Sequence, residues 1–347
     1  MWERFRLQVD QKTKKAQYTC IVETIHAFFL YLIIMDMEQI EKTQFYIGGA
    51  VGRVLPRSSD KCLGNVIRID NFALKRASVL VRCWYRFRMW ILYLHKIADT
   101  EIYAQDHIAF SQALICGGKY TLLEDGPGFY RNCKNNKLIH PFKNSFFRRI
   151  AVWFTWGRIQ GNIFGLNKQC INRIVTTHKD LQSEVLKGRN VRYCNLRGLW
   201  QNSTDEKRKF VLNVFNFTDT LRLECQKAET IILTQPFCVD TDMTSDELAN
   251  IYRPYVEKYK KEGVIIKSHP RDRTDYKKYF PYAICISVPV PMQLLVFVGV
   301  NFKRAVTVFS TAVSEFGKET ELIILGTDVN EKLLATYGHI EAKTYCP

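Results

Sequence analysis

The chain has 347 residues, of which 47% are hydrophobic and 24% are charged. This length suits two domains of ordinary size, and the apolar content excludes an intrinsically disordered chain. The formal net charge of +16 predicts attraction to polyanions such as nucleic acid, anionic lipid or phosphorylated ligands. The 11 cysteines include no Cys-x-x-Cys pair, so they favour reduced thiols in a cytoplasmic protein over a zinc site.

The first half of the chain opens with an expected strand and a buried helix. Residues 18–22 predict the strand, and residues 25–35 form the most lipid-like run of the chain. That run is well short of the roughly 20 residues that a membrane-spanning helix needs. We therefore expect a buried helix, no spanning segment, and a second strand at residues 45–47.

Residues 75–95 predict a helix that mixes arginines with aromatic side chains. Arg82, Arg86 and Trp90 share one face of it by their four-residue spacing. A basic, aromatic face of this kind can lie on an anionic membrane. It can also pack between domains while its arginines reach solvent. The sequence leaves both interpretations open.

Two later segments, residues 146–149 and 153–158, interleave aromatic residues with arginines in the same way. Such patterns are typical of proteins that bind single-stranded nucleic acid or rest on anionic lipid. Because neither an RNP-type signature nor a known DNA-binding motif is present, the membrane interpretation is favoured.

An acidic turn follows the strand expected at residues 120–123. It contains Glu124, Asp125 and Gly126. Adjacent side chains at the end of a strand diverge, so one carboxylate can face a cleft while the other makes structural hydrogen bonds. A general base needs such a placement, although an ordinary acidic turn has the same composition.

The composition becomes polar and rich in turn residues between residues 196 and 209, where we place a domain boundary. The expected domains are residues 1–200 and 201–347. Five short apolar runs follow, with helix-length segments between several of them, which predicts a parallel, doubly wound domain. These runs are residues 230–233, 264–266, 283–286, 305–309 and 322–325.

Polar side chains follow two of these runs directly. His269 ends the second run in a basic turn, and Ser310 and Thr311 follow the fourth run. In open α/β sheets the ligand lies beyond the carboxyl ends of the strands. With Lys267 and Arg271 these residues predict a phosphate pocket.

Three short motifs now stand in a fixed order, Glu124-Asp125-Gly126, His269-Pro270 and Ser310-Thr311. This order resembles the bacterial sialyltransferases, and among them glycosyltransferase family 52, the lipooligosaccharide and capsule sialyltransferases. The segments around residues 104–107, 233–236 and 267–271 also resemble that family.

The resemblance implies a GT-B fold, in which two Rossmann-like domains of the α/β class face each other across a central cleft. It implies transfer of sialic acid from CMP-sialic acid, held by the second domain, to a terminal galactose of lipooligosaccharide or capsule, with an α-2,3 linkage. No metal or other cofactor and no specific nucleic acid are expected. Some relatives form homodimers, so a homodimer is one expected state. The expected location is the cytoplasm, peripheral on the anionic inner membrane.

The resemblance also implies roles for individual residues. Asp125 would be the base that takes the proton of the acceptor hydroxyl, and protonated His269 would donate to the departing phosphate. The reaction would invert the configuration of the sugar. The residues implied to bind the donor are Glu124, Gly126, Gln235, Lys267, Pro270, Arg271, Ser310 and Thr311.

Two features leave alternatives open. Gln293 stands where relatives have a glutamate in a Pro-x-Glu pattern, and in some relatives the base has been placed shortly before the His-Pro motif. The alternative bases here are Asp240, Asp242 and Asp246. Two other functions also fit the sequence: a GT-B glycosyltransferase that uses another nucleotide sugar, and a basic nucleic-acid-binding protein without catalysis.

Overall fold

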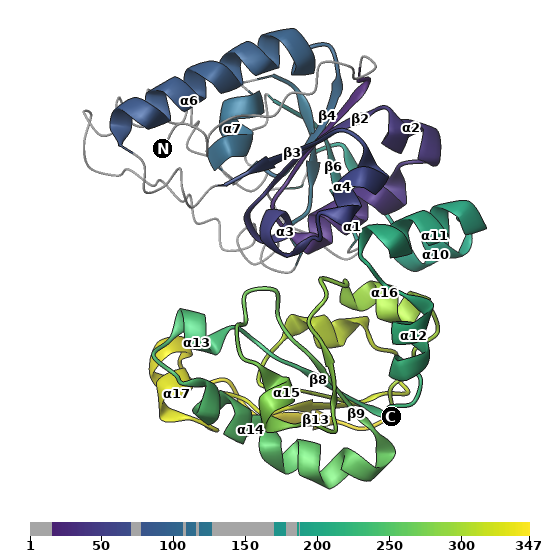
Figure 1. Ribbon diagram of the computed structural model, residues 1–347, viewed down its shortest axis with the longest axis vertical. Helices are drawn as coiled ribbons and strands as arrows, with labels where there is room; N and C mark the ends of the chain where they lie inside the picture. Colours follow the sequence, from purple (N-terminus) through teal and green to yellow (C-terminus); the bar gives the residue numbers. More distant parts are fainter. Residues whose placement is uncertain are drawn as a thin grey trace. The chain divides into compact units, whose positions relative to one another are not determined.

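The computed structural model describes residues 16–70, 78–106, 109–115, 118–126, 170–177, 186 and 188–347. The chain divides into two compact units, Met1–Val214 and Phe215–Pro347, and Figure 1 shows an open sheet in each. The two arginine-rich segments at 146–149 and 153–158, and His107, lie outside the described residues.

The described strands of the first unit form a parallel sheet in the order β3-β2-β1-β4-β5-β6-β7. Strands β1, β2 and β5 confirm the strands expected in this half. The other strands described in this unit were not foreseen from the sequence. The bounds are β1 (Tyr18–Val22), β2 (Thr43–Gly48), β3 (Val66–Ile69), β4 (Glu101–Ala104), β5 (Tyr120–Leu123), β6 (Ile171–Thr176) and β7 (Val191–Tyr193).

Helices cover both faces of this sheet (Figure 1). Helices α6 (Val79–Leu92) and α7 (Ala109–Ile115) pack on one face, where their buried side chains join residues of β1, β4 and β5 in one core. On the other face lies α1 (Ile25–Ile34), whose N-terminus is capped by the Thr24 hydroxyl and whose central residues are fully buried. The burial of α1 confirms the helix expected there.

Shorter helices complete the first unit. They are α2 (Met37–Glu41), α3 (Gly49–Val54), α4 (Ser58–Leu63), the π-helical turn η2 (Tyr93–Ile97), α10 (Leu196–Gln201) and α11 (Asp205–Val214). Within the described parts of both units, no helix combines the length and the apolar character needed to cross a membrane.

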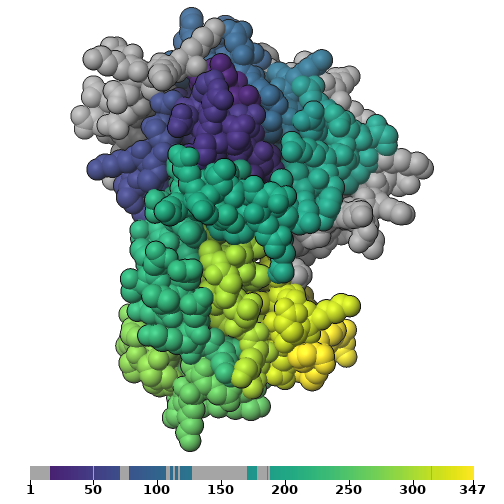
Figure 2. All heavy atoms as spheres, turned by 90° about the vertical axis from the view of Figure 1, so that its right-hand side faces the viewer, coloured from purple at the N-terminus to yellow at the C-terminus, as the bar shows by residue number. Residues whose placement is uncertain are grey.

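Helix α11 belongs to the first unit, although the sequence placed the boundary before it. Figure 2 shows teal atoms packed against the purple atoms of the first unit, where α10 contacts α1 and α11 contacts α4. Two hydrogen bonds anchor α11: the Ser59 hydroxyl donates to the Val214 carbonyl at 2.6 Å, and the Lys207 amine donates to the Ile33 carbonyl at 2.7 Å. The division therefore follows α11, because packing and not local composition decides which unit a helix joins.

The second unit contains a sheet in the order β10-β9-β8-β11-β12-β13. Every pair is parallel except the edge pair β12–β13. All five expected strands are present, and β13 was not foreseen because its exposed residues carry no apolar pattern. The bounds are β8 (Thr230–Leu233), β9 (Val264–Lys267), β10 (Ile284–Ile286), β11 (Arg304–Thr307), β12 (Glu321–Ile324) and β13 (Lys343–Tyr345).

One face of the second sheet packs on a core to which the long helix α14 (Ser245–Tyr259) contributes Leu248, Tyr252 and Val256, all fully buried. The helix begins with a capping box formed by Thr244 and Glu247. The remaining helices are α12 (Asp219–Cys225), α13 (Phe237–Asp240), η3 (Lys260–Glu262), α15 (Tyr276–Tyr279), α16 (Met292–Phe297), η4 (Thr311–Glu315) and α17 (Glu331–Tyr337).

Both sheets are doubly wound. The strand order reverses between β1 and β4 in the first unit and between β8 and β11 in the second. Such reversals open a crevice at the carboxyl ends of the two strands, where ligands of α/β proteins bind. The structure thus confirms the expected α/β class with two Rossmann-like units.

Gly263, which precedes β9, has a φ of +79°, and a Cβ atom there would lie 2.7 Å from the Lys227 carbonyl oxygen. We expect Gly263→Ala to lower the free energy of unfolding by about 2–4 kcal/mol, because it adds a clash to backbone strain. Gly338 has a φ of +73° with no atom within 4 Å of the added carbon, so Gly338→Ala should lose only about 1–2 kcal/mol. Urea denaturation measures both, and equal losses would contradict the crowding argument.

Candidate functional site

Polar side chains collect at the carboxyl edge of the first sheet. Glu23 and Thr24 follow β1, Gln105 follows β4, and Glu124 and Asp125 follow β5. Because these strands are parallel, all of these residues emerge at the same edge, around the reversal between β1 and β4.

Gln105 holds Asp125 in place. Its fully buried carboxamide accepts hydrogen bonds from the backbone amides of Glu23 at 2.7 Å and Thr24 at 3.1 Å. Its Nε2 donates to Asp125 Oδ1 at 2.5 Å and to Thr24 Oγ1 at 3.0 Å. Since the amide is fixed on both sides, Asp125 is presented from a rigid support while its side chain stays partly exposed.

Glu124 turns the other way and is fully buried. Its carboxylate lies 2.7 Å from Nε2 of His26 and accepts hydrogen bonds from the backbone amide of Thr177, at 2.8 Å, and from the Thr177 hydroxyl. It therefore joins α1, β5 and the end of β6. The two carboxylates diverge as a strand end requires, and the predicted contact of Glu124 with a donor stays a prediction.

Gly126 ends the acidic motif with a φ of +79°, which favours glycine, and it lies beside the His26 ring. A donor contact at Gly126 also stays a prediction.

The turn after β9 is tied down by one hydroxyl and one carboxylate. Thr234, which follows β8, accepts a hydrogen bond from the His269 amide at 3.2 Å and donates to Asp272 Oδ2 at 2.7 Å. Asp272 also accepts from the Tyr276 hydroxyl at 2.8 Å and the Thr274 amide at 3.0 Å. This network fixes the backbone of the His269-Pro270 turn, and nothing in the sequence motifs had singled out Asp272.

The His269 ring is neutral at pH 7. Burial, followed by the positive charges of Arg271 and Lys267, lowers the pKa of His269 to about 4. The backbone amide of Arg271 donates to Nδ1 at 3.1 Å, so the proton of the neutral ring sits on Nε2. The expected role of a protonated His269 in the donor complex stays a prediction, and in the ligand-free protein Nε2–H is a hydrogen-bond donor.

Lys267 is the last residue of β9 and carries a positive charge. Among the residues that the structure describes, no acidic side chain pairs with its ammonium group, and burial lowers the pKa of Lys267 to about 8. At pH 7 the group is still charged. A partly buried, uncompensated positive charge favours the binding of an anion.

Arg271 is already paired. Its guanidinium donates two hydrogen bonds of 2.7 Å to the Asp240 carboxylate. This fork occupies both carboxylate oxygens, so neither Arg271 nor Asp240 is poised for a ligand without rearrangement. Of the other candidate bases, Asp246 accepts from the Tyr279 hydroxyl at 2.5 Å, and Asp242 is exposed.

Gln235 bridges the reversal between β8 and β11, and Ser310 follows β11 beside it. The Gln235 carboxamide oxygen accepts from the Phe309 amide at 3.0 Å, and the Ser310 amide donates to the Thr307 hydroxyl at 3.1 Å. The Ser310 hydroxyl accepts from the Ala312 amide at 3.3 Å, and Thr311 is exposed beside it. The structure thus brings Gln235, His269 and Ser310 to adjacent strand ends.

Gln293 donates from Nε2 to the Glu315 carboxylate at 2.8 Å. Gln293 is buried in the first turn of α16, and Glu315 ends η4. A carboxylate therefore lies next to the position where relatives carry one. No local sequence pattern points to Glu315, because 22 residues separate it from Gln293.

The described ranges contain no group of three or more His, Cys, Asp or Glu side chains that could hold a metal ion. The expectation that no metal is needed stays a prediction.

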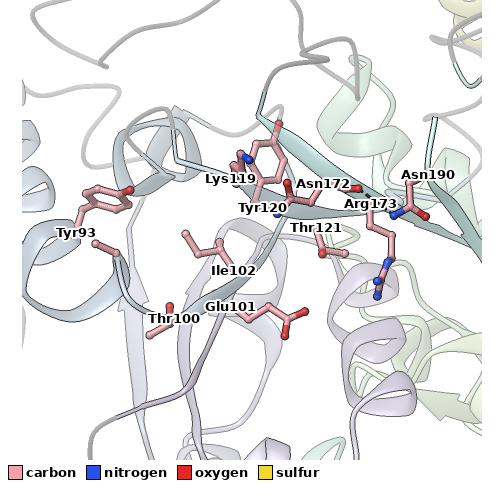
Figure 3. A pocket seen from close by; sticks show the side chains of 11 residues that line it. Tyr93, Thr100, Glu101, Ile102, Lys119, Tyr120, Thr121, Asn172, Arg173 and Asn190 are labelled. Atoms are coloured by element: carbon pink, nitrogen blue, oxygen red, sulfur yellow. Dashed lines mark hydrogen bonds between the residues drawn. The ribbon is translucent and has the colours of Figure 1, made fainter. Parts of the chain in front are cut away.

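A cavity of about 330 Å³ lies away from these residues (Figure 3). Glu101, Tyr120 and Asn172, at the amino ends of β4, β5 and β6, line it together with Lys119 and Arg173. It is therefore at the opposite edge of the first sheet from Asp125, and it is no part of the candidate site.

Residues 82–332 match the family model described as glycosyltransferase family 52. The chain belongs to glycosyltransferase family 52. It is thus a glycosyltransferase, which confirms the family expected from the three motifs. An uncharacterised protein of Haemophilus influenzae is 30% identical over 247 residues, which are 71% of this chain and 74% of that protein.

The solved structures that resemble this family 52 chain share its fold. A sialyltransferase of Photobacterium damselae, residues 113–497, aligns with a TM-score of 0.56 at 12% identity over 88% of this chain and 89% of that one. A Listeria monocytogenes protein named as a putative UDP-N-acetylglucosamine 2-epimerase aligns with a TM-score of 0.51 at 10% identity. The alignment covers 90% of this chain and 79% of that one. At this identity the likeness establishes the GT-B fold and no more.

Replacing Lys267 tests the uncompensated charge. We expect Lys267→Met to raise the free energy of unfolding by about 1–3 kcal/mol in the ligand-free enzyme, because it removes a desolvated cation and keeps the apolar stem. Exposed Lys227, where Lys227→Met should change stability by less than about 0.5 kcal/mol, is the matched control. A loss of stability in Lys267→Met would show that an anionic partner already compensates the charge.

Proposed function

We propose that this enzyme transfers sialic acid from CMP-sialic acid to a terminal galactose of a bacterial surface glycan. One observation carries the proposal: Lys267 and the Nε2–H of His269 lie at the carboxyl end of β9, and the hydroxyls of Ser310 and Thr311 follow β11, the two strands that flank β8. This set suits an anionic leaving group. The fold shared with a protein named as a sialyltransferase supports the same substrate class.

The second unit would assist the departure of CMP. As the bond between the anomeric carbon and the phosphate oxygen breaks, both bonding electrons leave with CMP. His269 Nε2–H and the Ser310 hydroxyl would donate hydrogen bonds to the phosphate oxygens, while Lys267 would offset their charge. Arg271 would join them only by leaving Asp240.

The first unit would activate the acceptor. The acceptor hydroxyl attacks the anomeric carbon from the face opposite CMP, and its proton passes to Asp125. Attack from the opposite face inverts the configuration. The support that Gln105 gives to Asp125, together with the Arg271 pairing of Asp240, favours Asp125 over Asp240 as the base.

Further parts of the proposed reaction are the donor ribose contact, the linkage formed and the place where the enzyme works. Glu315, placed by Gln293, would supply the carboxylate that relatives direct to the donor ribose. Transfer would need no metal and would form an α-2,3 linkage on lipooligosaccharide or capsule. The enzyme would work in the cytoplasm on the inner membrane.

Release of CMP from CMP-sialic acid, with lactose as acceptor, tests the assignment. We expect Asp125→Asn and His269→Asn each to lower kcat by about a hundredfold or more, because each removes a proton transfer or a charge-stabilising bond in the transition state. The matched controls are Asp246→Asn and His339→Ala, which change an exposed carboxylate and an exposed imidazole and should keep near-normal rates.

Three results would contradict the proposal in different ways. A loss in Asp246→Asn with normal Asp125→Asn would move the base to Asp246, in the first turn of α14. Thermal stabilisation by UDP or GDP, but not by CMP, would change the donor; saturation at a hundred times the dissociation constant adds about 2.7 kcal/mol. No turnover with any nucleotide sugar by a folded protein would reject transfer altogether.

The pKa of His269 gives an independent test of the phosphate site. In the free enzyme the ring should titrate near pH 4. Bound CMP should raise this pKa by about one to two units, because the phosphate charge favours the imidazolium form. NMR of the ring carbons against pH, assigned with His269→Asn, measures the shift. His339 is the internal control, and an unchanged His269 pKa would place the phosphate elsewhere.

A further inference from the structure

Helix α6 has two apolar faces. Tyr85, Met89 and Leu92 are buried in the core of the first unit. The opposite side, which we call the outer face of α6, carries large apolar side chains that remain exposed. They are Val79, Leu80, Trp84, Phe87, Trp90, Ile91 and Leu94, the last on η2.

The outer face is wide and continuous. At 100° per residue its side chains cover an arc of about 140°, broader than the apolar stripe of an ordinary surface helix. Leu80 is 82% exposed, Phe87 is 55% exposed and Trp90 is 47% exposed. Soluble proteins rarely leave such a patch in water, so a partner is expected to cover it.

Arginines border this arc on both sides. Arg82 and Arg86 project along one margin and Arg88 along the other, where its guanidinium lies 4.9 Å from the centre of the Trp84 ring. No Asp or Glu occurs between Asp70 and Asp99. Within this segment the margins therefore carry arginines and no carboxylate, while the centre is apolar and aromatic.

The charge of the margins distinguishes between the partners that could cover the outer face of α6. If a second copy docked by the same face in a symmetric dimer, arginine margins would meet arginine margins with no acidic residue of the segment to neutralise them. An anionic lipid surface supplies both requirements, since headgroup charges meet the arginines and the acyl boundary receives the apolar arc. Tryptophan suits that boundary because its ring is apolar and its indole N–H is polar.

We propose that the outer face of α6 is a membrane-docking surface that lies in the headgroup region of an anionic bilayer. The inner face keeps the helix on the core, so α6 would lie parallel to the membrane without crossing it. The sequence suggested either a membrane face or a packing face for this segment, and the structure assigns the packing to the inner side. The proposal holds whichever sugar is transferred, because it uses no residue of the candidate site.

Vesicle flotation with the full chain tests the proposal. Vesicles of phosphatidylcholine with about 30% phosphatidylglycerol should bind the protein at least about tenfold more tightly than pure phosphatidylcholine, with binding that weakens as salt rises. The double variant Phe87→Ser and Trp90→Ser should lose about tenfold or more in affinity. The double variant Arg86→Gln and Arg88→Gln should lose about fivefold per charge on anionic vesicles.

Matched controls change exposed apolar and arginine residues elsewhere. They are Leu223→Ser with Leu334→Ser, and Arg57→Gln with Arg197→Gln, which should bind like the parent protein. Circular dichroism and melting temperature establish that each variant is folded. The salt dependence of the parent protein needs no variant, so the proposal remains testable if a variant unfolds.

Two outcomes would overturn the proposal. Equal binding to anionic and neutral vesicles, or equal loss in the control variants, would reject the outer face as an anionic-lipid surface. If the parent protein binds no vesicles and sediments as a dimer that Phe87→Ser with Trp90→Ser converts to a monomer, a second copy covers α6 instead.

Discussion

The parallel pairing of β8 with both β9 and β11 is the constraint on which the donor-side site depends. It delivers Gln235, the His269 turn and Ser310 to neighbouring strand ends, although 75 positions separate the first from the last. Each reversal of strand order is bridged by a glutamine: Gln105 links β4 to the end of β1, and Gln235 links β8 to the end of β11. A carboxamide suits this place because it both accepts from a backbone amide and keeps a donor for a second partner.

The charged residues of the candidate site differ in whether an acidic side chain pairs with them. Lys267 stays charged without an acidic partner in the described structure, whereas Arg271 is neutralised by the Asp240 fork. Burial, followed by the charges of Arg271 and of this lysine, lowers the pKa of His269, so the site disfavours further positive charge. An arriving phosphate would reverse this balance.

Helix α6 packs on the core with one face and exposes apolar side chains on the other. Its inner side chains complete the core of the first unit, while its outer side chains and bordering arginines have the pattern of an interfacial helix. The carboxyl edge of the first sheet carries Asp125, and neither this edge nor the cavity at the amino edge involves the outer face of α6. Docking and chemistry therefore use different side chains and can be altered separately.

The sequence by itself determined the α/β class, most strands of the second unit and the family, because apolar runs and the polar residues that follow them are local features. It also identified Asp125, His269 and Ser310 as candidates. The tertiary structure alone decided their surroundings: that Glu124 is buried against His26, that Arg271 pairs with Asp240, that His269 is neutral, and that Asp272 and Glu315 lie beside the site. Each of these depends on residues distant in the chain being brought within hydrogen-bond or Coulomb range, which local sequence patterns do not encode.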